Sequence, residues 1–162
     1  MKYCYSCGTE LIIRPLEGEG EIPYCEKCAK FVFPIYSTAV SMIVQSPDNS
    51  RILLIQQYSK PHNILVAGYI NKGEGAEDAV RREIMEETGL RVHDITFNKS
   101  EYFPPSETLM LNFSCTAESD DLSGINNREI DLAQWFTREQ AKCAIKPDSL
   151  AQKFLLHFLE KS

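Results

Sequence analysis

Three glutamates, Glu83, Glu86 and Glu87, are spaced so that they could bind a metal ion together. Residues at i, i+3 and i+4 share one face of a helix, so the spacing predicts three clustered carboxylates. Such like charges repel by roughly 0.2–0.5 kcal/mol per pair, and a divalent cation offsets that repulsion. Carboxylates combined with water and substrate phosphates suit Mg²⁺ or Mn²⁺. The alternative is an ordinary solvated acidic helix, which the cluster alone would favour.

The glutamates belong to a longer pattern that runs from Gly68 to Leu90. Its fixed positions are Gly68, Glu74, Arg82, Glu83, Ile84, Glu86, Glu87, Gly89 and Leu90. Glycines before the acidic cluster predict a loop whose backbone can approach a ligand. An apolar stripe at helical spacing then predicts a helix, formed by Ala76, Ala79, Val80 and Ile84. Gly89 is placed to end that helix.

This pattern resembles the Nudix box at every fixed position. Because of this resemblance, we favour a metal site over an ordinary solvated acidic helix. The resemblance implies the Nudix fold, an α/β/α sandwich in the α+β class. It also implies a hydrolase that uses a divalent metal to cleave a nucleoside diphosphate linked to another group.

The same resemblance assigns roles residue by residue. It implies that Glu83 and Glu87 bind Mg²⁺ or Mn²⁺ and that Glu86 is a further ligand or an acid/base partner. Arg82 would orient the glutamates, and a backbone carbonyl near Ala67 or Gly68 would complete the site. Outside the box, Glu129 resembles the residue that delivers one further carboxylate to the metals; the alternative is a plain surface carboxylate. Tyr69 and Asn71 depart from common family usage, at positions that bear on substrate choice.

Four cysteines near the start of the chain predict a separate metal site. Cys4 and Cys7 form one pair, Cys25 and Cys28 the other, and each pair is separated by two residues. This is the spacing of a structural four-thiolate Zn²⁺ site. So short a segment cannot bury a sufficient core, so metal binding would supply its folding free energy. The alternatives are two disulfides or four free thiols. We expect the other two cysteines, Cys115 and Cys143, to be buried thiols.

A four-cysteine ribbon directly before a Nudix domain resembles the NADH pyrophosphatases of this superfamily. The stretch from Ser100 to Met110 is similar to their post-box segment, although a Gln-Pro-Trp portion is missing. The resemblance places Phe33 and Tyr69 beside the nucleotide base; the alternative is that both pack in a domain interface. Within the post-box segment, Phe103 and Ser106 are further candidates for substrate binding.

Composition excludes several other classes of protein. The chain has 162 residues, of which 43% are hydrophobic and 25% charged, so it is not a disordered chain. Its net charge of −6 and pI near 5.1 argue against duplex DNA as a partner. We find no signal peptide and no apolar run of membrane-spanning length, and therefore expect a cytoplasmic protein.

The remaining sequence predicts the elements that position these residues. We expect a zinc ribbon over residues 1–32, with short strands at 11–13 and 22–24 and a turn at 18–21. A Nudix domain should follow over residues 35–162. Alternating or continuous apolar runs predict strands over 36–44, 51–57, 64–66, 95–99, 109–117 and 135–136. Helical periodicity predicts helices over 140–145 and 150–159, the second capped by Asp148 or Ser149.

We therefore interpret the chain as a pyrophosphatase that acts on a nucleotide-derived small molecule such as NAD(H) or ADP-ribose. Two alternatives remain open. One is a regulatory module that binds a nucleotide without cleaving it. The other is a hydrolase that removes nucleotide caps from RNA, although residues 4–28 contain only Arg14 and Lys27 as basic residues, against five glutamates. The family resemblance is also compatible with a homodimer.

Overall fold

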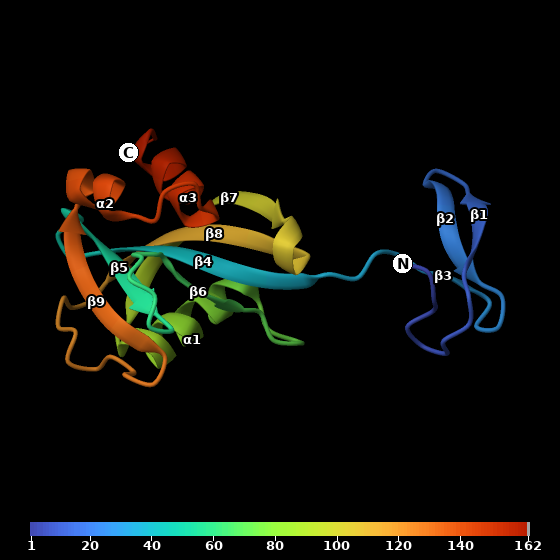
Figure 1. Cartoon of the computed structure of the whole chain (residues 1–162), viewed down its shortest axis with the longest axis horizontal. Coiled ribbons are helices and arrows are strands. Elements are labelled where there is room, and N and C mark those ends of the chain that lie inside the picture. The colour runs from blue at the N-terminus through green and yellow to red at the C-terminus, as the bar shows by residue number, and fades with distance from the viewer. Residues whose placement is uncertain (162) are drawn as a thin grey trace. The chain divides into compact units, whose positions relative to one another are not determined.

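The structure is a computed structural model that describes residues 1–161. The chain divides into two compact units, Met1–Tyr36 and Ser37–Ser162, which we call the N-terminal and C-terminal units (Figure 1). Each unit has its own sheet and its own buried residues, and each is described by itself.

The N-terminal unit is a small antiparallel sheet. Its strands are β1 (Ile12–Leu16), β2 (Gly20–Cys25) and β3 (Lys30–Phe31), in that order. The turn between β1 and β2 is closed by a hydrogen bond from Glu19 N to Leu16 O. The unit buries only three residues in its hydrophobic cluster: Cys4, Cys25 and Val32. A core of this size is too small to stabilise a fold on its own.

The C-terminal unit is built on a mixed sheet with the order β7-β8-β4-β5-β9, and β6 pairs with β4. Its strands are β4 (Ser37–Gln45), β5 (Arg51–Gln57), β6 (Val66–Tyr69), β7 (Val92–Phe103), β8 (Thr108–Ala117) and β9 (Ile130–Thr137). Strand β4 pairs in parallel with β8 along its whole length. On its other side it pairs with β6 through four residues and with β5 at its end, where Gln45 lies opposite Ile52. Strands β4 and β5 therefore meet at one end and diverge at the other.

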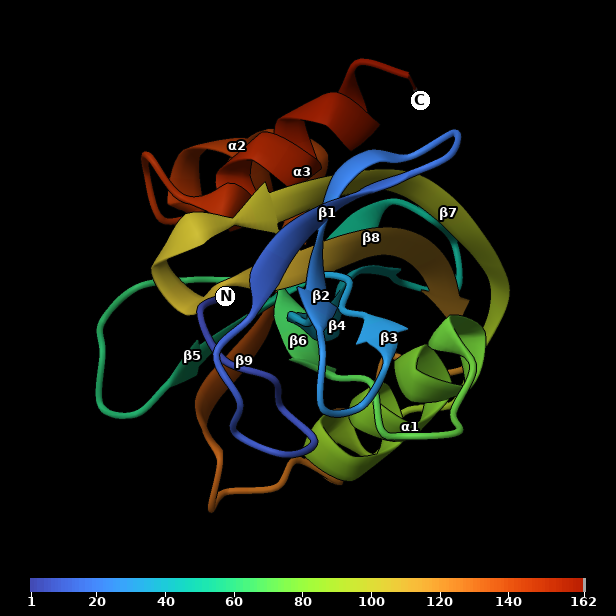
Figure 2. The same cartoon turned by 90° about the vertical axis from the view of Figure 1, so that its right-hand side faces the viewer.

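Helices cover both faces of this sheet. Helix α1 (Ala76–Thr88) lies on one side, and α2 (Arg138–Ala144) and α3 (Leu150–Leu159) lie on the other (Figure 2). A 3₁₀ turn, η1 (Pro104–Ser106), joins β7 to β8. The arrangement confirms the expected α/β/α sandwich. No helix in residues 1–161 is long and apolar enough to cross a membrane.

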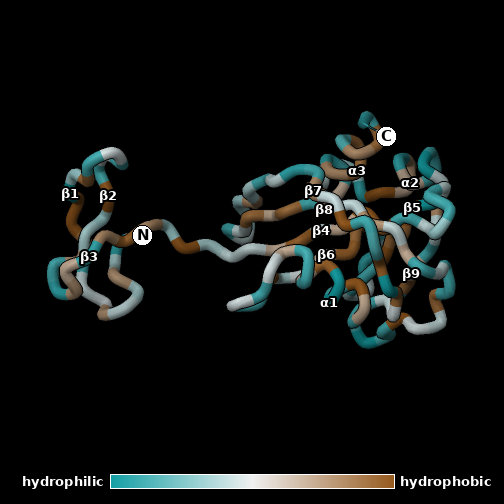
Figure 3. Tube along the Cα trace, turned by 180° about the vertical axis from the view of Figure 1, so that it is seen from behind, coloured by the Kyte–Doolittle hydropathy of each residue, from teal (hydrophilic) through white to brown (hydrophobic). Residues whose placement is uncertain are grey.

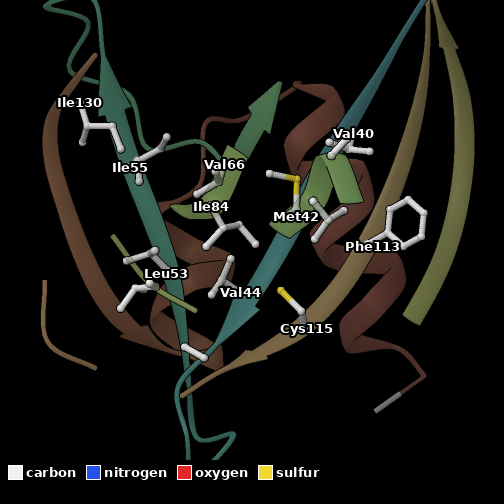
Figure 4. Packing of buried hydrophobic residues seen from close by; sticks show 14 residues of the cluster. Val40, Met42, Val44, Leu53, Ile55, Val66, Ile84, Phe113, Cys115 and Ile130 are labelled. Atoms are coloured by element: carbon white, nitrogen blue, oxygen red, sulfur yellow. The ribbon is translucent and has the colours of Figure 1, made fainter. Parts of the chain in front are cut away.

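Two hydrophobic clusters fill the spaces between the sheet and its helices. The first packs α1 against the sheet and includes Val40, Val66, Ile84 and Phe113. Figure 4 shows Val66 and Ile84 in the space between the diverging strands β4 and β5. The second cluster packs α2 and α3 against the opposite face. The hydropathy colouring in Figure 3 shows hydrophobic segments along β4 and β6 and hydrophilic ones in many of the loops.

Most expected elements are present, but several boundaries differ. The strand predicted over 64–66 lies at Val66–Tyr69 (β6), and β9 begins at Ile130, before the predicted 135–136. Strand β5 begins and ends as predicted. Strand β7 extends beyond the predicted 95–99 in both directions, because pairing with β8 supports its polar positions. Helix α2 begins at Arg138, before the predicted residue 140. Thr137 and Gln140 form a capping box there, each side chain bonding to the other residue's backbone N–H. Ser149 caps α3 by accepting a hydrogen bond from Gln152 N.

The prediction for Cys143 was wrong, whereas Cys115 is buried as expected. Helix α2 turns the fully buried Ala141 toward the core. Two residues further along a helix lie nearly on the opposite face, so Cys143 is exposed.

Gly89 ends α1 with φ of +72°, and a Cβ there would lie 2.9 Å from the Gly124 backbone. We therefore expect Gly89→Ala to lower the free energy of unfolding by at least about 2 kcal/mol, through backbone strain and overlap together. Gly73→Ala is the control, because Gly73 has φ of +86° but no atom near its Cβ position. Urea denaturation should show a smaller loss for the control; equal losses would contradict the role of Gly124.

Candidate active site

Arg82 organises the loop before α1 and the start of the acidic cluster. Its guanidinium binds both carboxylate oxygens of Glu74, at 2.7 and 2.9 Å. The same group donates to Glu83 at 2.7 Å, to Glu86 at 3.1 Å and to the Tyr69 carbonyl at 3.0 Å. Such a charge-assisted, partly bidentate network fixes geometry better than single hydrogen bonds do. Arg82 thus ties the loop to the helix.

Glu74 was a fixed position of the sequence pattern to which no role had been assigned. The Arg82 guanidinium and the Asn71 backbone N–H both donate to its carboxylate. These bonds lower the pKa of Glu74 to about 2, with Arg82 as the first cause. Glu74 therefore stays ionised near neutral pH and serves as the structural partner of Arg82.

The Glu83 side chain lies against the Gly68 backbone. A Cβ built on Gly68 would overlap the Glu83 carboxylate, so any side chain there would displace this carboxylate from its position beside Arg82. Gly68 belongs to β6, which pairs with β4, and Glu83 belongs to α1. The contact brings backbone atoms of β6 next to a helical carboxylate. The glycines in the sequence predicted a close approach of backbone to a ligand, whereas this contact is with a side chain of the protein itself.

Glu87 is almost completely buried, with 4% of its surface exposed. Its carboxylate accepts a 3.3 Å hydrogen bond from the Gln57 amide. No cationic side chain within residues 1–161 forms an ion pair with it. Burial, together with the negative charges of Glu83 and Glu129, raises the pKa of Glu87 to about 7. A buried carboxylate that faces two others fits a cation, which would remove this electrostatic cost.

These residues surround a pocket of about 520 Å³ at the open end of the sheet. The predicted site residues that line it are Ala67, Gly68, Tyr69, Glu83, Glu87, Phe103, Ser106 and Glu129. Carboxylates from α1 and from the segment before β9 thus meet backbone from β6 and side chains from the β7–β8 turn. The pocket combines an acidic wall with aromatic and apolar surface, as nucleotide-binding pockets often do.

Three predicted residues lie elsewhere. Arg82 and Glu86 do not line the pocket, and the Glu86 side chain is 58% exposed and paired with Arg82. The helix turns Glu87 inward and leaves Glu86 at its surface, so the three carboxylates do not share one environment. Phe33 is an exposed residue of the N-terminal unit.

The sequence analysis missed several residues of the pocket. Tyr58 lines it from the loop after β5, and Gln57 binds Glu87 from the end of that strand. Ala39, Thr108, Met110 and Leu150 contribute to the opposite wall. No sequence signal marks Tyr58, because its position depends on how β5 pairs with the distant β9. Gln57 is the last residue of one predicted strand and Thr108 directly precedes another, and a polar residue at such a position can point into a site.

The four cysteines of the N-terminal unit converge as their spacing predicted. Their sulfur atoms all lie within 4.8 Å of one another, and Cys7 Sγ is 3.5 Å from Cys25 Sγ. Hydrogen bonding to Cys7 raises the pKa of Cys28 to about 12, whereas the Thr9 hydroxyl lowers the pKa of Cys7 to about 6. Four such thiols cannot all ionise without a cation between them. The cluster therefore fits a metal ion.

A sequence model of the family described as NUDIX domain matches residues 35–158, and the chain belongs to the Nudix family. The chain is 37% identical to "Nudix hydrolase 19, chloroplastic" of Arabidopsis thaliana, over 89% of this chain and 34% of that protein. It is 33% identical to "NAD-capped RNA hydrolase NUDT12" of Homo sapiens, over 86% of this chain and 31% of that protein. The chain thus spans about a third of the length of these relatives.

Solved structures show the same fold. A NUDIX hydrolase from Nitrosomonas europaea superimposes with a TM-score of 0.67 at 24% identity, covering 99% of this chain and 92% of that one. The NUDIX domain of Shewanella oneidensis NrtR, solved with ADP ribose, gives a TM-score of 0.65 at 16% identity. It covers 85% of this chain and 93% of that one. The fold is therefore that of the Nudix family.

The raised pKa of Glu87 predicts how pH affects the metal-free protein. Between its usual pKa of 4.5 and its folded value of about 7, the folded state holds a proton that the unfolded state releases. Stability should therefore fall as pH rises through this window. In EDTA, Glu87→Gln should be more stable than the wild type at pH 8, by about 1–3 kcal/mol, and equal to it at pH 4.

Glu77→Gln is the matched control, because Glu77 lies exposed in the first turn of the same helix. Urea denaturation at the two pH values measures the difference. A Glu87→Gln variant with no pH-dependent gain over the wild type would contradict the buried, uncompensated carboxylate.

Proposed function

We propose that this protein hydrolyses a pyrophosphate bond in a nucleoside diphosphate linked to another group, such as NAD(H) or ADP-ribose. One observation carries the proposal. Glu83, Glu87 and Glu129 come from two separate segments and line one pocket together with the backbone of Ala67 and Gly68. Oxygen atoms of this kind suit Mg²⁺ or Mn²⁺.

The chain's own residues would divide the work between binding and orientation. Glu83, Glu87 and Glu129 hold the divalent ions, and a carbonyl of Ala67 or Gly68 completes the ligand set. Divalent ions held there would supply charge neutralisation of the pyrophosphate and activation of a water molecule. A carboxylate that lines the pocket would accept the proton of the water; Glu86, the residue expected from the family, does not line it. No nucleophilic side chain is required.

Arg82 would act by positioning Glu83. Its four acceptors fix the guanidinium, and the guanidinium in turn fixes the carboxylate that lies over Gly68. Arg82 does not line the pocket, so we assign it no contact with the substrate.

The aromatic wall of the pocket supports a nucleotide substrate. Tyr69 and Phe103 are both exposed aromatics that line it, and the Ser106 hydroxyl lies 2.9 Å from that of Thr108. Exposed rings offer stacking surfaces for a base, and hydroxyls offer hydrogen bonds. Phe33, the other aromatic expected at the substrate, is an exposed residue of the N-terminal unit.

For the N-terminal unit we propose a structural Zn²⁺ site formed by Cys4, Cys7, Cys25 and Cys28. Two features of the structure support zinc. The sulfur atoms are close enough for a tetrahedral ion with Zn–S distances of about 2.3 Å. The unit also buries too few residues to fold without another source of free energy. On this proposal residues 1–32 are a zinc ribbon and residues 35–162 a Nudix hydrolase domain.

Removal of NAD caps from RNA is a second candidate, because several relatives bear the name "NAD-capped RNA hydrolase". The chemistry would be the same, and only the group beyond the pyrophosphate would differ. Residues 4–28 carry two basic residues against five glutamates, which favours a small substrate. A third candidate, nucleotide sensing without cleavage, is disfavoured because all three box glutamates are present. Product analysis on NADH, ADP-ribose, ADP-glucose and capped RNA distinguishes the three.

Metal dependence is the direct test of the proposed chemistry. Hydrolysis of NADH or ADP-ribose should stop in EDTA and return when Mg²⁺ or Mn²⁺ is added in excess. Glu87→Gln should fold normally and lower kcat by several decades, about 4 kcal/mol or more in activation free energy. Glu77→Gln on the same helix should leave kcat within twofold. If Glu87→Gln turned over substrate at a rate near the wild-type value, Glu87 would not be an active-site residue.

The zinc proposal predicts a fixed metal content. Purified protein should carry about one zinc per chain, measured by elemental analysis. Cys25→Ser should lose the zinc, whereas Cys143→Ser, which changes an exposed cysteine outside the cluster, should keep it. Zinc-free protein with two disulfides by mass spectrometry would disprove the four-thiolate site.

A further inference from the structure

Tyr58 is the most exposed large hydrophobic side chain among residues 1–161, with 73% of its surface accessible. It nevertheless lines the pocket that contains Glu83, Glu87 and Glu129. An exposed aromatic ring gains little stability from its surroundings, since it leaves most of its apolar surface in water. A ring kept in that position at the mouth of a pocket is available to a ligand.

The backbone around Tyr58 adopts a conformation that few residues adopt. The pairing of β5 with β9 shifts register between Gln56 and Gln57, which is a bulge of the kind that re-aims side chains beside active sites. Tyr58 and Ser59 follow with φ of +56° and +55°. Two consecutive non-glycine residues with backbone φ in the left-handed region are uncommon, and they are retained where the surrounding structure requires them.

Three hydrogen bonds hold this turn in place. Ser59 N donates to the Asp131 carboxylate at 2.6 Å, which ties the turn to β9. Lys60 N donates to Gln57 O at 3.1 Å and closes the turn. The Gln57 side chain donates to Glu87 at 3.3 Å. The residue before Tyr58 thus contacts the acidic wall directly, so the ring is positioned relative to the carboxylates.

Tyr58 lies across the opening of the sheet from the other two aromatic residues of the pocket. Tyr69 ends β6, which pairs with β4, and Phe103 ends β7. Tyr58 follows β5, on the far side of the gap between β4 and β5 that Figure 4 shows. Strand β5 pairs with β4 only at Gln45 and Ile52 and diverges from it toward the pocket, where β6 pairs with β4 instead. The acidic wall therefore has aromatic residues on both sides.

We propose that Tyr58 determines substrate specificity by stacking on a ring in the group linked through the pyrophosphate to the nucleoside. This deepens the proposed function and rests on it. Tyr69 and Phe103 then serve the nucleoside, and the pyrophosphate lies over the carboxylates between them. A substrate with a ring system at each end contacts both sides, whereas one with a single base contacts only one. The chain should accordingly favour dinucleotides.

NADH and ADP-ribose test this directly, because they share the ADP-ribose portion and differ by the nicotinamide ring. Tyr58→Ala should lower kcat/KM for NADH at least tenfold, about 1.4 kcal/mol, and for ADP-ribose less than twofold. Tyr58→Phe keeps the ring and should stay within twofold of the wild type on both. Phe97→Ala, which removes an exposed ring of β7 that does not line the pocket, is the control. Melting temperatures of all variants check the fold.

A second variant tests the positioning of the ring without changing it. Asp131→Asn weakens the bond that anchors Ser59 and should lower kcat/KM for NADH more than for ADP-ribose, by a smaller factor than Tyr58→Ala. If wild-type protein cleaves both substrates and Tyr58→Ala affects both equally, or neither, the role of Tyr58 is refuted while the proposed function stands. If the wild type cleaves neither substrate in Mg²⁺, the proposed function fails, and the role of Tyr58 fails with it.

Discussion

The ion pair between Arg82 and Glu74 is the interaction on which the site depends. It joins the loop that leaves β6 to the helix that carries the acidic residues, and it is bidentate and largely shielded from water. The same guanidinium holds Glu83, whose carboxylate lies against the Gly68 backbone. Because these contacts share one cation, displacing it would release the loop, the carboxylate and the close backbone approach together. The charged positions Glu74, Arg82 and Glu83 of the sequence pattern therefore form one hydrogen-bonded network.

The glutamates at positions 83, 86 and 87 of α1 occupy three different environments, although they span only five positions. Glu83 is held by Arg82, Glu86 lies at the surface, and Glu87 is buried against Gln57. Only Glu87 is buried without a compensating positive charge, so its ionised form is disfavoured in the metal-free protein. A structural acidic cluster would show no such asymmetry. The fold has placed an ionisable group where it is unfavourable on its own, as is common at functional sites.

Much of this fold could be predicted from the sequence because the signals are local. The spacing of the glutamates, the apolar stripe of α1 and the terminating Gly89 all act within one helix, and each was located correctly. Glu129 was reached only through the family resemblance, since nothing near it marks a site. Tyr58 could not be predicted at all. Its conformation is fixed by Asp131, about seventy residues further along the chain, and depends on a pairing of β5 with β9 that no local pattern reveals.

The parallel pairing of β4 with β8 has a consequence for how this pocket can change. Ala39 lies opposite Met110, and both line the pocket, whereas the next pair, Val40 and Leu111, packs in the core. Successive residues of a strand face opposite sides, so a slip of one residue would exchange these roles and a slip of two would restore them. The turn at Pro104–Ser106 joins β8 to β7 and sets the register of that antiparallel pair, not the register of β8 with β4. A one-residue slip of β8 along β4 would keep the two strands paired but would move Met110 out of the pocket, so this register should tolerate shifts only in steps of two.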